Sequence, residues 1–175
     1  MRPSSYLGIE GYEPRWLHGW RPTHDAHGDR LRGLVGRVLT RGRVAWDPPA
    51  DRWVTECPVL LDFEGEQVEV NHKAATAMSI TWNTIDPARP VVWNGHRWVW
   101  RDDVAPELVA LRGRRVRAVD LLEWHVPDDV DDDEVREVAV AFTIGDTELV
   151  VYNEADDTRL RTGPPTAWHR RHRLG

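Results

Sequence analysis

The chain has 175 residues, of which 41% are hydrophobic and 30% charged, and its formal net charge is −6. This length suits one well-buried core, and the composition is typical of a soluble globular protein. No stretch approaches the roughly 18 apolar residues of a membrane span, and the negative charge argues against a general nucleic-acid binder, which needs cations at phosphates.

Residues 1–33 show no sustained hydrophobic period and are interrupted by several prolines and glycines, which predicts an irregular N-terminal arm. The arm holds Tyr6, Tyr12, Trp16 and Trp20. Because exposed aromatic area costs roughly 25 cal/mol per Å², we expect the arm to pack on the body. Residues 1–6 lead into no signal-like apolar segment and Cys57 is the only cysteine, so a reducing cytoplasm fits best.

Residues 34–163 are predicted to form one β domain with an internal repeat, 34–70 and 111–151. Each copy begins with a Leu-x-Gly-Arg-like segment, reaches a tryptophan before a proline-containing turn, and ends in two alternating strands around Glu64-Gly65 or Gly145-Asp146. Each copy thus predicts a three-stranded meander, and two such sheets would form a mainly β antiparallel sandwich or half-open barrel. In this arrangement Trp46, Trp53 and Trp124 are expected in the core.

A Trp-rich hairpin over residues 91–100 links the two copies, because Asn94-Gly95 between β-branched and aromatic runs predicts a two-residue turn. Strand alternation then puts Trp93, His96, Trp98 and Trp100 on one face. That face serves either as core or as an exposed platform with Arg101 beside it. One short helix is predicted at residues 106–111, with proline in its first turn.

Charge is unevenly distributed along the chain. Residues 128–134 form an acidic block that includes Asp129, Asp131, Asp132 and Asp133, whereas residues 164–175 form a basic tail without acids. The first 163 residues therefore carry a formal charge of −9. The acidic block is a candidate landing site for a cationic surface, including the chain's own tail.

No sequence motif identifies a catalytic or cofactor site. The chain lacks a nucleophile elbow, a phosphate-binding loop and a dinucleotide fingerprint, and Cys57 is best interpreted as a buried structural residue. The histidines His18, His24 and His27 match no known metal-ligand spacing, and the acidic block lacks the glycine and terminal glutamate of a calcium loop. We therefore predict no metal and no cofactor.

These observations favour a non-enzymatic cytoplasmic protein whose acidic body caps a basic macromolecular partner, as an immunity-type or inhibitory protein does. The first alternative is a small-molecule binder or enzyme with a pocket between the copies, lined by Trp82 and the hairpin indoles, with His96 as acid or base. The second is binding of single-stranded nucleic acid by stacking on those indoles, with the basic tail at the phosphates. The acidic body disfavours this second alternative.

Overall fold

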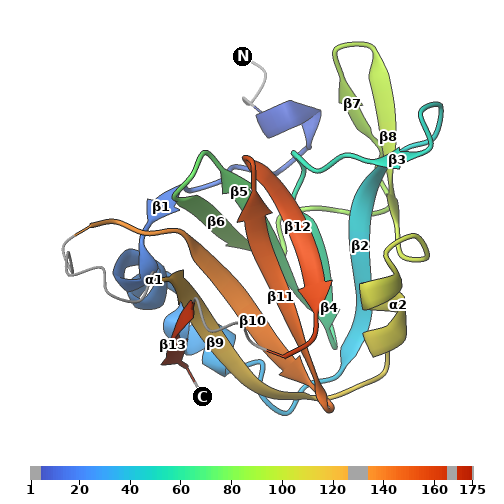
Figure 1. Cartoon of the computed structure of the whole chain (residues 1–175). Coiled ribbons are helices and arrows are strands. Elements are labelled where there is room, and N and C mark those ends of the chain that lie inside the picture. The colour runs from blue at the N-terminus through green and yellow to red at the C-terminus, as the bar shows by residue number, and fades with distance from the viewer. Residues whose placement is uncertain (1–4, 126–133, 165–168, 175) are drawn as a thin grey trace.

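The computed structural model describes residues 5–125, 134–164 and 169–174, which form a mainly β sandwich of two antiparallel sheets (Figure 1). The eight-stranded sheet has the order β1-β6-β5-β4-β2-β8-β7, with β3 paired to β2, and the five-stranded sheet has the order β12-β11-β10-β9-β13. No helix in these described segments is long and apolar enough to cross a bilayer.

The elements of the first sheet are β1 (Leu17–His18), β2 (Leu39–Asp47), β3 (Arg52–Trp53), β4 (Val59–Phe63), β5 (Glu66–Lys73), β6 (Ala77–Trp82), β7 (Val91–Trp93) and β8 (His96–Arg101). Those of the second are β9 (Val116–Trp124), β10 (Val138–Ile144), β11 (Thr147–Glu154), β12 (Asp157–Thr162) and β13 (His169–Arg173). The helical elements are η1 (Tyr6–Gly8), α1 (Trp20–Arg32) and α2 (Pro106–Leu111).

The two predicted three-stranded meanders are confirmed, one in each sheet. Strand β4 pairs with β2 and β5, and strand β10 pairs with β9 and β11, all antiparallel. The internal sequence repeat behind them stays a prediction. The short helix α2 also forms as predicted, and it packs over Gly42 of β2, where an added Cβ would lie 2.9 Å from Leu108 Cδ1.

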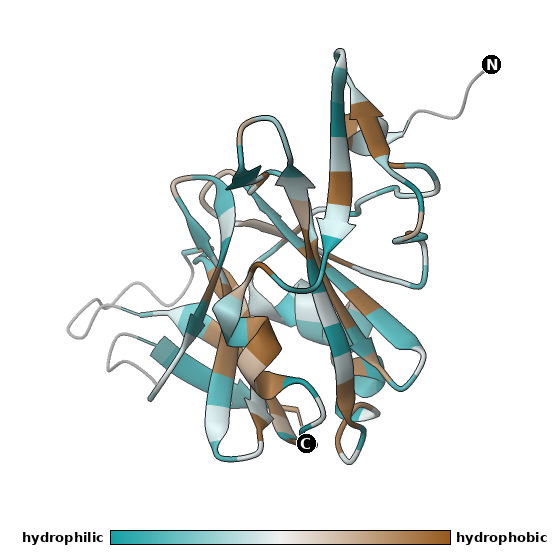
Figure 2. Ribbon diagram, turned by 90° about the vertical axis from the view of Figure 1, so that its right-hand side faces the viewer, coloured by the Kyte–Doolittle hydropathy of each residue, from teal (hydrophilic) through white to brown (hydrophobic). Residues whose placement is uncertain are grey.

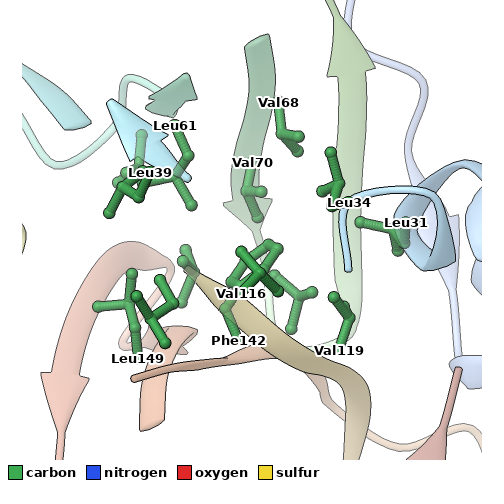
Figure 3. Close-up of a cluster of buried hydrophobic side chains, with 14 of the residues drawn as sticks. Leu31, Leu34, Leu39, Leu61, Val68, Val70, Val116, Val119, Phe142 and Leu149 are labelled. Carbon is green, nitrogen blue, oxygen red and sulfur yellow. The ribbon is translucent and has the colours of Figure 1, made fainter. Parts of the chain in front are cut away.

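The core lies between the sheets (Figure 3). Leu39, Leu61, Val68 and Val70 of the first sheet face Val116, Val119, Phe142 and Leu149 of the second, and Leu31 and Leu34 close one side. The rings of Phe63 and Phe142 meet at the centre, 5.4 Å apart. The alternation of apolar residues along each meander therefore supplies the two faces of one core.

The irregular-arm prediction was wrong over residues 20–32, which form helix α1. Pro22 is tolerated because the first turn of a helix needs no intrahelical N–H donors. Gly28 is buried against the His24 ring, and a Cβ added at Gly28 would lie 3.4 Å from Cδ2 of His24. The helix is stabilised by packing on the sandwich, where Leu31 is fully buried, and this tertiary contribution leaves little periodic signal in the sequence.

The expectation of a hanging basic tail was also wrong for His169–Arg173. These residues form β13, which pairs antiparallel with β9 in a register that places Arg171 opposite Leu122 and Arg173 opposite Asp120. The tail therefore completes one edge of the five-stranded sheet.

A buried polar network joins the two sheets at one end of the core. Thr158 of β12 donates its hydroxyl to Asn71 Oδ1 at 2.9 Å and accepts the backbone N–H of His72 at 3.0 Å. Nε2 of His72 lies 3.3 Å from the carbonyl oxygen of Val138, and Nδ1 has no hydrogen-bond partner among the residues that the structure describes. Complete burial lowers the pKa of His72 to about 4, so the ring is neutral in the folded protein.

Candidate binding surfaces

The Trp-rich hairpin forms as predicted. Asn94 and Gly95 have φ values of 46° and 80°, as a type I′ turn requires, and the register pairs Val91 with Trp98 and Trp93 with His96. Strands β7 and β8 project beyond the sandwich (Figures 1 and 2). The hairpin thus presents its tip to the surroundings and its base to the body.

Most of the indole face of the hairpin is a second core. Trp98 is only 8% exposed and packs with Ile9 and Tyr12 of the N-terminal arm, and Trp100 is half-buried against the same cluster. Trp93 near the tip is 37% exposed. The arm therefore packs on the body, and together with the hairpin it covers the outer face of the eight-stranded sheet.

Trp82 lies far from the hairpin indoles. It is on β6, which is separated from β8 by β5, β4 and β2, a span of about 19 Å at the usual strand spacing. Its indole N–H donates to His27 Nδ1 at 3.2 Å, and the Arg30 guanidinium lies 4.5 Å from its ring. The structure therefore does not gather Trp82, Trp93, Trp98 and Trp100 around one pocket.

The polar residues predicted beside the hairpin indoles have separate surroundings. His96 is exposed and stacks on Trp98, with ring centroids 6.1 Å apart. Arg101 donates to Asp103 through Nε and Nη2, at 2.9 and 2.8 Å, and lies over the ring of Trp46. Among residues 5–125, 134–164 and 169–174, no acid or base forms a hydrogen bond or ion pair with His96.

The four aspartates of the predicted landing site, Asp129, Asp131, Asp132 and Asp133, lie outside the described residues. Of the tryptophans expected in the core, Trp53 packs against the main core and Trp46 is half-buried, but Trp124 is 41% exposed. The core expectation was wrong for Trp124, because its side chain follows Leu122 onto the outer face of the five-stranded sheet.

The edge formed by β9 and β13 is a carboxylate–guanidinium network that the sequence did not predict. Asp120, which is fully buried, accepts from Arg171 Nη1 at 2.7 Å and from Arg173 Nε at 2.6 Å. Arg171 also binds Glu148 of β11 with two bonds, of 2.8 and 3.1 Å. Bidentate geometry of this kind gives strong, specific pairing. The signal was non-local, since the partners are 23 to 53 residues apart in sequence.

On the other side of the same edge, His172 of β13 lies parallel to Trp20 of α1, with centroids 3.7 Å apart and planes within 11°. Its Nε2 is 3.3 Å from Glu123 Oε1. These residues border an open, polar cleft of about 550 Å³ that also includes Arg21, Glu134 and Arg136. The contacts hold α1 to the sheet edge, which gives His172 a structural role.

A smaller pocket of about 420 Å³ lies on the outer face of the five-stranded sheet. Its lining includes Trp124, Glu137, Tyr152, Arg161 and His169, and Tyr152 packs on a third apolar cluster made of Leu122, Ala139, Ala141 and Val150. The sequence did not predict this pocket, because its residues come from four strands of the sheet and the segment just before β10.

Other candidate chemistry is not assembled in the described residues. Cys57 is fully buried, and burial raises the pKa of its thiol, as expected of a structural cysteine. Across residues 5–125, 134–164 and 169–174, no three His, Cys, Asp or Glu side chains converge as metal ligands. His18 instead bonds the Thr76 hydroxyl at 3.0 Å, and His27 bonds Trp82.

No protein-family model matches this chain, and no curated protein or solved structure is significantly similar to it.

Proposed function

We propose that the protein is a non-enzymatic binding protein whose acidic face caps a basic macromolecular partner, in the manner of an immunity-type or inhibitory protein of a reducing cytoplasm. The observation that carries the proposal is the segregation of charge between the two parts of the chain. Residues 118–175, which supply nearly all of the five-stranded sheet, contain fourteen acids and six arginines, a formal charge of −8. Residues 1–117 carry +2.

The arginines of this half are largely occupied by its own carboxylates. Arg171 and Arg173 bind Asp120 and Glu148, and Arg159 lies 3.4 Å from Asp157. These ion pairs neutralise the arginines within the fold, so the remaining carboxylates leave an excess of negative charge. Fixed charge of one sign attracts a complementary surface and raises the association rate. The acidic segment 128–134 belongs to the same half of the chain.

The same contacts weaken the nucleic-acid alternative. It required the basic tail at phosphates, but Arg171 and Arg173 are bonded within the sheet, and it required stacking on hairpin indoles, of which Trp98 is buried. The first alternative required a pocket that unites Trp82 with the hairpin, and these residues lie on distant strands. Capping of a basic partner is the function that the described surfaces support best.

The test is calorimetric titration of the full chain with an oligolysine peptide and with a panel of basic globular proteins, first at about 0.01 M salt, where the Debye length is about 30 Å. We expect binding that weakens as salt is added. The double variant Glu134→Gln/Asp156→Asn removes two exposed charges from the acidic half. Its affinity should fall about fivefold, roughly 1 kcal/mol for two exposed charges.

The matched control is Asp51→Asn/Glu64→Gln, which removes two exposed charges from the other half and should bind as the parent does. The proposal fails if no basic probe binds at low salt. It also fails if the two double variants lose affinity equally, because binding would then follow net charge rather than the acidic half.

A further inference from the structure

The pocket on the outer face of the five-stranded sheet is built by strand register. Trp124 of β9 pairs with His169 of β13 and, on its other side, donates its backbone N–H to the carbonyl oxygen of Glu137 at 2.9 Å. Tyr152 lies opposite Arg159 of β12 and packs on Ala139, which follows Glu137 by two residues. Side chains two residues apart share a face, so these groups surround one depression over an apolar floor.

Glu137 is the unusual member of this group. Its side chain is half-buried, and within the described residues no hydrogen bond or ion pair reaches its carboxylate. Burial raises the pKa of Glu137. A carboxylate that has lost part of its water without gaining a partner is a site where a cation would bind with little further desolvation cost.

The aromatic neighbours favour the same kind of ligand. Trp124 and Tyr152 offer π-faces, and indole and phenol rings attract cations within about 6 Å. The His169 ring lies edge-on to Trp124 at 5.5 Å, and burial together with Arg161 and Arg171 lowers the pKa of His169, so it adds an aromatic edge rather than a positive charge. Arg161 also lines the pocket, with Nη1 3.4 Å from the carbonyl oxygen of Pro164.

We propose that this pocket binds one cationic side chain, of the lysine or arginine type, from the basic partner, with its charge at Glu137 and its aliphatic stem between Trp124 and Tyr152. The inference rests on the proposed function and names its anchor point. A second carboxylate, Glu154, lines the pocket and lies 3.8 Å from Nε of Arg159. A volume of about 420 Å³ admits one long side chain.

The test uses three small probes: the N-acetyl N-methylamides of lysine, arginine and norleucine. Norleucine is the matched neutral probe, because it keeps the aliphatic stem and lacks the charge. In proton–nitrogen NMR spectra of the full chain, the cationic probes should shift the Trp124 indole N–H saturably, and norleucine should not. The ratio of lysine to arginine affinity then tells which cation the pocket prefers.

Glu137→Gln should weaken the cationic probes about tenfold, as expected when a charge-assisted bond is lost. The variant should fold at least as well as the parent, because it removes an unpaired, partly buried charge. Glu64→Gln, on the β4–β5 turn, is the control and should leave probe binding unchanged. The inference is overturned if norleucine binds as well as lysine, or if Glu137→Gln binds the cations as the parent does.

The two proposals fail separately. If oligolysine binds in the charge-dependent way described above but the single-residue probes leave Trp124 unshifted, the pocket is refuted and the acidic-face function stands. If the lysine probe binds through Glu137 but no basic macromolecule binds, the acidic-face function is refuted and the pocket stands as a site for a small organic cation.

Discussion

His72 gives the fold a specific sensitivity to acid. Its pKa is about 4 in the folded protein and 6.5 when unperturbed, a difference equivalent to about 3 kcal/mol. Since the unfolded chain takes up the proton first, stability should fall as the pH drops through 6.5 and stop responding to this residue below 4. About 2.4 kcal/mol of the loss belongs to the interval between about pH 7 and about pH 4.5.

The variant that isolates this contribution is His72→Gln, which keeps a donor at the position of Nε2 near the Val138 carbonyl and cannot titrate in this range. Urea unfolding at the two pH values gives the free energy of unfolding for each protein. The loss on acidification should be about 2.4 kcal/mol smaller for the variant than for the parent, because carboxylates titrate alike in both. His96→Gln, at an exposed histidine, is the control and should lose as much stability as the parent between the two pH values. Equal losses for His72→Gln and the parent would show that His72 does not cause this acid sensitivity.

Three further predictions concern stability. Asp120→Asn should lower the free energy of unfolding by about 3 kcal/mol, because Arg171 loses one of its two carboxylate partners, Asp120 and Glu148. It should also expose the amides of β13 to hydrogen exchange, and unchanged protection of β13 would contradict the prediction. Glu69→Ala should cost about 3 kcal/mol in urea unfolding, because the carboxylate accepts the N–H groups of Thr84 and Ile85 at 2.9 and 3.1 Å. Gly42→Ala should lower the free energy of unfolding by about 1–3 kcal/mol, because the added methyl group would clash with Leu108 of α2. Most of this loss should disappear in a Leu108→Ala background, and additive losses in the double variant would exclude the contact.

The sequence predicted those elements whose conformation is determined by residues close together in the chain. Asn94-Gly95 favours a tight turn because both residues adopt positive φ, and alternating apolar residues defined the two meanders. Pro106 in a first helical turn correctly indicated α2. In each case the energetic preference is present within a few residues.

The missed features depend on distant partners. Residues 169–173 look like a charged tail until Asp120 and Glu148 lie beside them, and only the folded sheet provides those acids. Helix α1 contains Pro22 and Gly28 and depends on burial of Leu31 against the sandwich. The pocket at Glu137 needs strands β9, β11, β12 and β13 and the segment just before β10 to lie side by side, and no segment of the chain specifies this alone.

The position of β13 also affects the order in which the protein acquires its structure during synthesis. Its neighbour β9 is made some fifty residues earlier, as their registered pairs show, and until β13 emerges β9 presents an unpaired edge. Asp120 has no guanidinium partner during that interval. The five-stranded sheet is therefore completed only after its last strand leaves the ribosome, and nascent or prematurely terminated chains expose an edge on which neighbouring chains can assemble.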